Sequence, residues 1–259
     1  MLAALTWGCE SEPSSSAGAG VVASASAAKP SGLVIPVDEK PVEEKAPEPE
    51  KPKKKAEDCA TGNTLSFDDP ALEQGIRFKL QKMTGALTKA DLGRLSSLNL
   101  SQAKVNELDI CLFPHMTNLK ELFLGPGDLS DLSPIAGLKN LETLGASINR
   151  VSDLTPLEKL TKLDRLDLGR TKVKDLSPLK GLTRLTELML DSAPVEDLSP
   201  LSGMKDLEKL SINKTMVKDV SPLAGLKKLK FLYVAETPAD EDPMSFAPIR
   251  ANGTKVVNL

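Results

Sequence analysis

Five aspartates recur at a constant spacing through the second half of the chain: Asp131, Asp153, Asp175, Asp197 and Asp219. If the chain repeats a structural unit of 22 residues, these side chains form one column. Carboxylates gathered in this way are ligands that Ca²⁺ prefers. Alternatively, each aspartate stands two residues before a serine or threonine and accepts hydrogen bonds from the backbone of a tight turn. We favour the turn, and we expect neither a metal site nor a cofactor.

The sequence offers little else that does chemistry. The single histidine, His115, has no carboxylate or cysteine at a motif spacing, which indicates a surface residue. The metalloprotease, hydrolase-elbow, CxxC and phosphate-loop motifs do not occur. A formal net charge of −3 and a pI near 5.5 give no electrostatic argument for nucleic acid. The longest apolar run is far shorter than a membrane span. We therefore expect no enzyme, no nucleic-acid partner and no transmembrane helix.

The elements that carry these residues repeat every 22 residues between Met116 and Leu226. In the block that begins at Leu160, Leu166 and Leu168 alternate as in a short strand, so both point inward. Ser177-Pro178 then predicts an N-cap followed by proline at the first position of a short helical turn. A fixed period of this length marks a solenoid, in which no block buries its apolar face alone.

These blocks resemble the bacterial leucine-rich repeats of the internalin-like class, with their LxxLxLxxNxVxDLSPLxxL frame. The resemblance extends from about Asp69 to the C-terminus. It implies an α/β solenoid: an arc with a parallel β-sheet on the concave face, short 3₁₀ or helical turns on the convex face and a helical N-terminal cap. At the ninth position of the frame, Asn or Thr can hydrogen-bond the backbone, whereas Ala or Gly cannot. The residues at this position are Ala103, Gly127, Asn149, Thr171, Ala193, Thr215 and Thr237.

The repeats need caps at both ends. From Phe67 to Thr84 the sequence predicts a helix that Asp69 caps and Pro70 begins. Its apolar face contains Leu72, Ile76, Leu80 and Met83, and Gly85 suits its end. The first strand is expected at 95–100, and the first block is two residues longer than the others, in the turn that holds Cys111. After Val234 the period breaks, and Val257 with Leu259 would supply a last short strand.

Function in such a solenoid is expected on the solvent side of the strands, at positions that alternate with the buried leucines. Two columns of outward residues are Ser97, Glu121, Thr143, Arg165, Glu187, Lys209 and Phe231, and Asn99, Phe123, Gly145, Asp167, Met189, Ser211 and Tyr233. A third is Ser101, Gly125, Ser147, Gly169, Asp191, Asn213 and Ala235. From these we select as candidate protein-binding residues Phe123, Arg165, Asp167, Glu187, Met189, Asp191, Lys209, Phe231 and Tyr233, since aromatic, Arg and Met side chains anchor interfaces.

Two alternatives stay open for this face. Phe231 and Tyr233 would be hidden if the C-terminal cap loop lay over them. The central charges, Arg165, Asp167, Glu187 and Asp191, would contribute little to binding if they only paired with one another across strands.

The N-terminal region differs from the repeats. Residues 1–9 end in Gly8-Cys9, which loosely resembles the end of a bacterial lipoprotein signal with its acylated cysteine, although Trp7 departs from that pattern and the segment is too short. A start codon further upstream would explain this; the alternative is a cytosolic N-terminus with a chance Gly-Cys. Residues 10–58 are rich in Pro, Ala, Ser, Glu and Lys, which predicts a disordered tether. The expected domains are then a cap (59–91), repeats (92–234) and a closing cap (235–259).

Cysteine usage connects these regions. If Cys9 carries the lipid, Cys59 and Cys111 remain as an even pair. A disulfide between them would staple the cap onto the first repeat, and such bonds persist outside the cytosol. The alternative is two buried thiols.

Together these features predict a monomeric, non-enzymatic module on a flexible tether, attached to a membrane only through a lipid and binding a protein or peptide in the bacterial cell envelope. The main alternative is a cytosolic leucine-rich-repeat scaffold or a regulatory subunit, as some repeat proteins of this kind bind phosphatases. A surface protein that recognises glycan is a third, which the few aromatic residues on the concave face disfavour.

Overall fold

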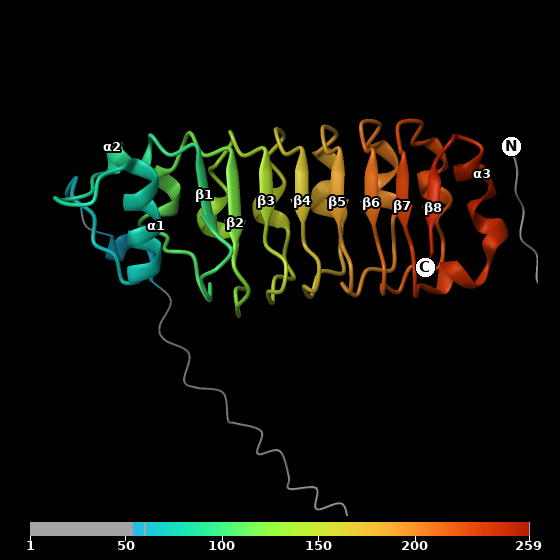
Figure 1. Cartoon of the computed structure of the whole chain (residues 1–259), viewed down its shortest axis with the longest axis horizontal. Coiled ribbons are helices and arrows are strands. Elements are labelled where there is room, and N and C mark those ends of the chain that lie inside the picture. Colours follow the sequence, from blue (N-terminus) through green and yellow to red (C-terminus); the bar gives the residue numbers. More distant parts are fainter. Residues whose placement is uncertain (1–53, 60, 259) are drawn as a thin grey trace, which may run out of the picture. The chain divides into compact units, whose positions relative to one another are not determined.

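The computed structural model describes residues 54–59 and 61–258, which belong to one compact unit. The predictions for Cys9 and for the tether before residue 54 lie outside the described residues. Eight parallel strands form one sheet in sequence order (Figure 1). They are β1 (Ser97–Leu100), β2 (Glu121–Leu124), β3 (Thr143–Gly145), β4 (Arg165–Asp167), β5 (Glu187–Met189), β6 (Lys209–Ser211), β7 (Phe231–Tyr233) and β8 (Lys255–Val257).

Strand register follows the sequence period. From β2 to β7 each residue pairs with the residue 22 positions later, as Thr143 does with Arg165. Between β1 and β2 the offset is 24, since Ser97 pairs with Glu121, so the first block is longer as predicted. The same longer offset separates β7 from β8, where Phe231 pairs with Lys255. The last strand contains Val257, and Leu259 lies outside the described residues.

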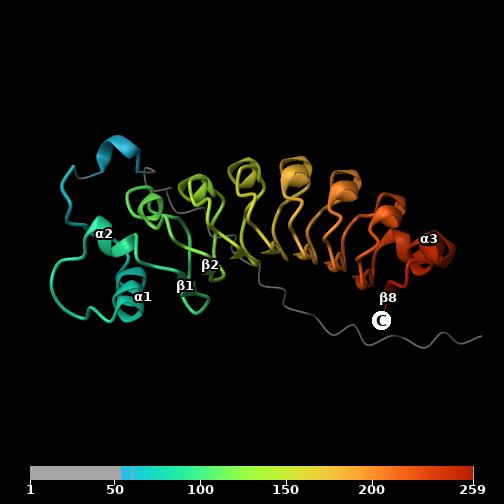
Figure 2. The ribbon, with the colours of Figure 1, turned by 90° about the horizontal axis from the view of Figure 1, so that it is seen from above.

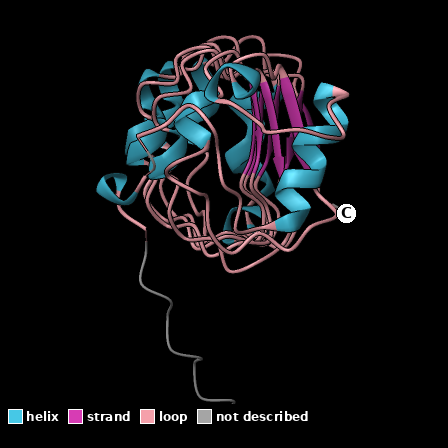
Figure 3. Ribbon diagram, turned by 90° about the vertical axis from the view of Figure 1, so that its left-hand side faces the viewer, coloured by secondary structure: helices cyan, strands magenta, loops and turns pink. Residues whose placement is uncertain are grey.

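The convex side of the arc consists of short 3₁₀ turns, as the fold prediction requires. Figure 2 shows these turns along the outer side and the strands along the inner side, and Figure 3 shows the strands gathered on one side of the stack. The turns in the five regular blocks are Ser133–Ile135, Thr155–Leu157, Ser177–Gly181, Ser199–Gly203 and Ser221–Gly225.

The predicted role of the Ser-Pro pair in these turns is wrong in one respect. The residue in the N-cap position is Leu176, and Ser177 is the first residue of the turn, with no side-chain cap bond. The backbone N–H of Ser177 donates to Asp175 Oδ1 at 2.8 Å. The same 2.8 Å bond recurs at the other four aspartates of the column. The aspartates therefore hold the turns, as we favoured from the sequence.

These bonds affect the acidity of the column. Hydrogen bonds from the hydroxyl and the backbone N–H two residues later lower the pKa of Asp153, Asp175 and Asp197. Among residues 54–59 and 61–258, no group of three or more His, Cys, Asp or Glu side chains is arranged to hold a metal ion.

The interior of the arc is one continuous cluster of leucine with some valine and isoleucine. Polar side chains enter it at the ninth position of the repeat. Asn149 is buried there, accepts from the Leu129 N–H at 3.2 Å and donates to the Gly125 carbonyl at 3.1 Å. Thr171 donates to the Leu168 carbonyl at 2.6 Å. Asn and Thr at this position thus satisfy backbone groups of the turns, as expected.

A left-handed residue follows each of five strands, one position before the ninth. Ile148, Arg170, Ser192, Lys214 and Glu236 have φ between 56° and 58°. This conformation is uncommon outside glycine, and most of all for a β-branched residue such as Ile148. Cross-repeat hydrogen bonds hold it, as where Ile148 donates to the Gly169 carbonyl at 2.8 Å.

The N-terminal cap contains α1 (Pro70–Leu80) and α2 (Lys89–Leu92). Asp69 caps α1 as predicted and accepts from Ala71 N–H at 2.8 Å. The helix ends earlier than expected, because Gln81 already adopts the left-handed conformation that terminates it; Gly85, with a φ of 80°, lies in the loop beyond. Met83 consequently lies beyond the helix and is exposed, whereas Leu72 and Ile76 are buried.

A disulfide joins Cys59 to Cys111, with 5.3 Å between the Cα atoms, and confirms the predicted pairing. It connects the short 3₁₀ turn Ala56–Asp58 to the irregular turn of the first repeat. The Lys54 ammonium forms ion pairs with Asp68 and Asp109 at the same place. Residues 54–58, which the sequence assigns to the tether, therefore contact the cap and the first repeat.

At the other end, 3₁₀ turns Pro238–Glu241 and Pro243–Phe246 lead into α3 (Ala247–Arg250). Phe246 and Ile249 are buried and belong to the C-terminal end of the core. None of the helices in the described part of the chain has the length and hydropathy needed to span a bilayer.

Candidate protein-binding face

The strands display the predicted outward columns on the concave face. In β4, Arg165 is exposed, Leu166 is buried and Asp167 is half-buried. The pairing of Arg165 with Glu187, and of Glu187 with Lys209, aligns one column across successive strands. The neighbouring column contains Asp167, Met189, Ser211 and Tyr233 in register. The alternation in the sequence was sufficient to place these residues on one face.

The β7 end of this face has two aromatic side chains. The ring centroids of Phe231 and Tyr233 are 6.5 Å apart with an interplanar angle of 22°. The ammonium of Lys209 lies 5.9 Å from the Tyr233 centroid. Phe231 is 40% exposed, and β8 continues the sheet beside it. Phe231 therefore does not lie under the cap loop, which was the alternative from the sequence, whereas Tyr233 is half-buried.

Phe123 supplies an exposed aromatic near the opposite end. Its side chain is 37% exposed, on β2. A Cβ atom at Gly145, its partner on β3, would lie 3.1 Å from Phe123 Cδ1. The ring therefore lies over the glycine, and Gly145 leaves the space that it occupies.

The charged side chains in the middle of the face bond mostly to groups other than one another. Arg165 forms its ion pair with Asp164, at 3.6 Å, rather than with Asp167 or Glu187. Asp167 accepts from the Gly169 N–H at 2.9 Å. The alternative left open from the sequence, in which the central charges only pair with one another across strands, is therefore not what these side chains do.

Asp191 is the centre of a polar network that the sequence did not predict. Its Oδ1 accepts from Ser211 Oγ at 2.6 Å, from Asn213 Nδ2 at 2.7 Å and from the Asn213 backbone N–H at 3.1 Å. Asn213 Oδ1 in turn accepts from the Ala235 N–H at 2.8 Å. Ser211, which the alternation places on the solvent side, is buried by this network. The only feature of the sequence that could have predicted this network is the spacing of Asp191 from Ser211 and Asn213, which lie 20 and 22 residues further along the chain.

A row of paired side chains borders the face where the strands begin. Lys120 Nζ bonds Glu142 Oε1 at 2.9 Å, and Lys230 Nζ bonds Glu208 Oε2 at 2.6 Å. Between these pairs, Thr186 donates to Asp164 Oδ1 at 2.6 Å. Each partner is 22 residues away, so these bonds tie adjacent repeats together.

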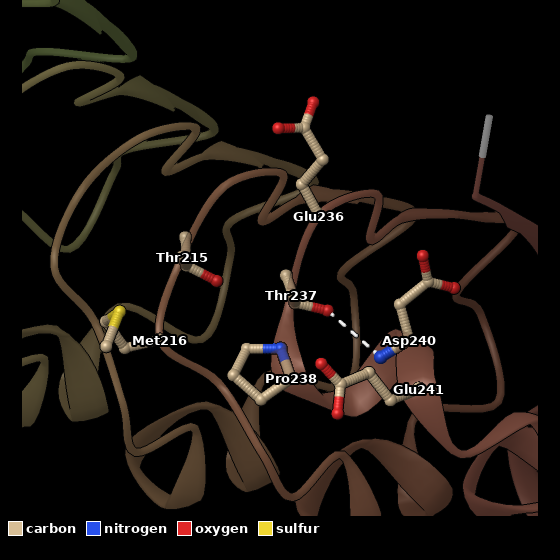
Figure 4. Close-up of a pocket in the computed structure, with 7 residues that line it drawn as sticks. All are labelled: Thr215, Met216, Glu236, Thr237, Pro238, Asp240 and Glu241. Atoms are coloured by element: carbon tan, nitrogen blue, oxygen red, sulfur yellow. Dashed lines mark hydrogen bonds between the residues drawn. The ribbon is translucent and has the colours of Figure 1, made fainter. Parts of the chain in front are cut away.

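An open pocket of about 460 Å³ lies between the turns that follow β6 and β7 (Figure 4). Most of its polar groups already bond within the chain. Thr237 Oγ1 accepts from the Asp240 N–H at 3.3 Å, and Glu236 pairs with Lys214 at 3.1 Å. Asp240 Oδ1 accepts from Asn258 at 2.8 Å. The pocket is therefore a weaker candidate for a binding site than the strand face.

His115 lies in the 3₁₀ turn Phe113–His115 on the convex side, away from the strand face. Desolvation and the nearby charge of Lys89 lower the pKa of its imidazole. The lowered pKa favours the neutral form of the ring.

Comparisons with known proteins agree with the fold. The family model described as leucine-rich repeats (2 copies) matches residues 139–181. A comparison with curated proteins finds no match. Internalin C2 from Listeria monocytogenes is 30% identical, with a TM-score of 0.67, over 74% of this chain and 83% of that one.

Two further solved structures are similar. An internalin (inlF) from Listeria monocytogenes is 30% identical, with a TM-score of 0.63, over 73% of this chain and 55% of that one. A leucine-rich repeat protein from Leptospira interrogans is 20% identical, with a TM-score of 0.52, over 64% of this chain and 50% of that one, and shares the fold alone. The 22-residue register, the strand face and these matches agree, and the chain belongs to the leucine-rich repeat proteins, with a repeat domain structurally similar to that of Listeria internalins.

Proposed function

We propose that the protein is a non-enzymatic recognition module that binds a protein or peptide on its concave strand face. Solenoids of this kind present an extended concave surface, and this is their usual binding surface. The observation that carries the proposal is the contrast between a uniform leucine interior and unlike outward side chains, with exposed Phe123 and Phe231 near the two ends. Eight strands about 4.8 Å apart give a face of about 34 Å, enough for about 800 Å² per partner.

The proposed contact residues are those of the strand face: Phe123, Arg165, Asp167, Glu187, Met189, Asp191, Lys209, Phe231 and Tyr233. The exposed aromatic rings and the partly covered Met189 and Lys209 are the best anchors, because interfaces draw most of their affinity from a few such residues. Asp167 and Asp191 bond within the chain and would act mainly by shaping the surface.

A binding assay with matched variants tests this proposal. Envelope extract is passed over immobilised full chain, over a concave variant with Phe123→Asp and Phe231→Asp, and over a convex variant with Lys180→Asp and Ser202→Asp in the outer turns. We expect a discrete protein to be retained by the wild type and the convex variant and lost from the concave variant. Equal retention by all three would exclude the concave face as the binding surface.

We further propose that the module acts at the bacterial cell envelope, held there by a lipid on Cys9 and by residues 10–58, and that caps at 59–91 and 235–259 enclose the repeats at 92–234. The Cys59–Cys111 disulfide supports an oxidising compartment, because cytosolic thiols are kept reduced. For the same reason it disfavours a cytosolic scaffold or phosphatase regulator.

Intact mass and membrane fractionation test the location, with the protein expressed from its own locus and its upstream sequence retained. The proposal requires an acyl mass on Cys9 and a membrane-associated protein, both lost in Cys9→Ser. An unmodified protein with free thiols at Cys59 and Cys111 would favour the cytosolic alternative.

A further inference from the structure

The concave face carries positive charge on its last three strands, whereas its earlier strands also carry carboxylates. The outward positions of β6, β7 and β8, here called the β6–β8 patch, include no carboxylate of their own; the Asp191 carboxylate reaches Ser211 from the preceding repeat and accepts hydrogen bonds from Ser211 and Asn213. The patch positions hold two lysines, two aromatic residues, a serine and a valine: Lys209, Ser211, Phe231, Tyr233, Lys255 and Val257. By contrast, the strands before them place Glu121, Asp167 and Glu187 on the same face.

In the part of the chain that the structure describes, the two lysines of the patch have no carboxylate partner. Bordering lysines are neutralised, as Lys120 is by Glu142 and Lys230 by Glu208. Among the described residues, neither Lys209 nor Lys255 has a carboxylate oxygen within 4.0 Å. Their charges therefore remain available to a bound partner.

Phe231 lies between these charges. In the strand register Lys209 pairs with Phe231, and Phe231 pairs with Lys255. Two strand spacings separate the two lysine Cα atoms by about 10 Å. Lys209 partly covers the Tyr233 ring, whereas Phe231 stays exposed, so a ligand meets an open apolar ring flanked by two cations.

We infer that the β6–β8 patch binds an acidic segment of the protein partner, in which two carboxylates flank apolar side chains. The inference rests on the proposed function and specifies which chemistry the partner presents at this end of the face. In a segment with the polyproline II conformation, three residues rise about 9 Å and bring the side chain back to the same face, so the carboxylates stand at positions i and i+3. Asp167 and Glu187 would repel the same segment from the middle of the face, which favours the patch over the other strands.

The chain has one tyrosine, so fluorotyrosine incorporation gives a single ¹⁹F NMR signal that reports on Tyr233 inside the patch. The probe is a synthetic peptide in which two aspartates flank a leucine–phenylalanine pair. The control peptide has asparagines in place of the aspartates. With the full-length protein, the acidic peptide is expected to shift the signal in a saturable way and the asparagine peptide to bind about tenfold more weakly, as two partly desolvated ion pairs require.

Charge variants provide the matched comparison. Lys209→Ala with Lys255→Ala should abolish the preference for the acidic peptide, whereas Lys174→Ala with Lys218→Ala, which removes the same charge from loops outside the strands, should leave it intact. The absence of a shift with the acidic peptide, or equal binding of both peptides, would overturn the inference.

The chain's own residues 33–39, LVIPVDE, also combine apolar and acidic side chains. Asp38→Asn with Glu39→Gln should leave the Tyr233 signal of the free protein unchanged; a shift would mean that the chain itself occupies the patch and would contradict a separate partner. If the extract partner still depends on Phe123 and Phe231 while the peptides show no acid preference, the inference fails and the proposed function stands. If partner binding is indifferent to the concave variant, the proposed function fails.

Discussion

Asp191 and Asn213 lie at equivalent positions of adjacent repeats and share two hydrogen bonds on one oxygen atom. Asp191 Oδ1 accepts from Asn213 Nδ2 at 2.7 Å and from the Asn213 backbone N–H at 3.1 Å. Ser211 adds a third bond to the same oxygen at 2.6 Å. Asp191, which we selected from the sequence as a binding residue, thus holds the backbone and side chains at the border of the strand face in place.

Asp191→Ala should destabilise the fold by about 1 to 3 kcal/mol, because it leaves the buried Ser211 hydroxyl and the Asn213 N–H without their acceptor. Asp197→Ala is the control, since that exposed carboxylate supports a single turn and should cost less. Urea unfolding of both variants measures the difference. Equal losses would show that the Asp191 network adds nothing beyond an ordinary turn.

The disulfide should stabilise the domain substantially. It closes a loop with a sequence separation of 52 residues, for which chain entropy gives about 4 kcal/mol. Reductant should therefore lower the denaturation midpoint of the wild type and leave Cys59→Ser with Cys111→Ser unchanged. After reduction, the loss of protection against amide hydrogen exchange should appear first in Phe113–His115 and in α1. A wild-type midpoint that is insensitive to reductant would contradict this prediction.

Gly125→Ala should be among the most damaging single-methyl substitutions in the repeats. A Cβ atom there would lie 1.8 Å from the Ala103 carbonyl oxygen and 2.6 Å from that of Leu100, and backbone atoms cannot move aside cheaply. We expect a loss of about 3 kcal/mol or more. Gly137→Ala is the matched control, because no atom lies within 4 Å of its Cβ position. Similar stability of the two variants would argue against this packing of the first repeat.

Acid should weaken the N-terminal cap. Hydrogen bonds from Lys82 and Thr88 lower the pKa of Asp91 from 3.8 to about 2. Because the folded pKa lies below the unfolded value, the stabilisation is fully present above about pH 4 and is lost as the pH falls towards 2. The lowered pKa values of Asp153, Asp175 and Asp197 act in the same direction.

Melting temperatures measured between about pH 5 and about pH 2 test this dependence. The wild type should lose stability steeply in that interval, and Asp91→Asn should lose less of it. If the two curves are parallel, Asp91 is not responsible for any of the acid sensitivity.

Much of the fold could be predicted because the period itself encodes it. Leucines at fixed positions determine which residues pair, and Arg165 and Glu187 align as the 22-residue spacing requires. The outward columns followed from alternation alone. The N-cap of α1 was equally readable, since Asp69 followed by Pro70 has few other interpretations.

The direction of some side chains and the sign of the backbone angle φ could not be predicted from the repeat in the same way. Ser211 reads as solvent-facing, but Asp191 draws its hydroxyl into a network that buries it. None of the five left-handed residues after the strands is a glycine, so the sequence does not indicate their positive φ, and a β-branched residue such as Ile148 argues against it. Hydrogen bonds between repeats explain this conformation. The end of α1 was predicted too late because Gln81, which adopts the left-handed conformation there, is not a glycine either.

The central claim, that the concave strand face binds a protein partner, is tested most directly by site-specific photo-crosslinking in the native cell. A photoreactive amino acid is placed at Phe123, Met189 or Phe231 on the concave face, or at Glu158, Lys180 or Ser202 on the convex face, with the full-length protein retained. We expect one discrete protein adduct from the concave positions and none from the convex positions. The same adduct from the convex positions, with none from the strand face, would contradict it.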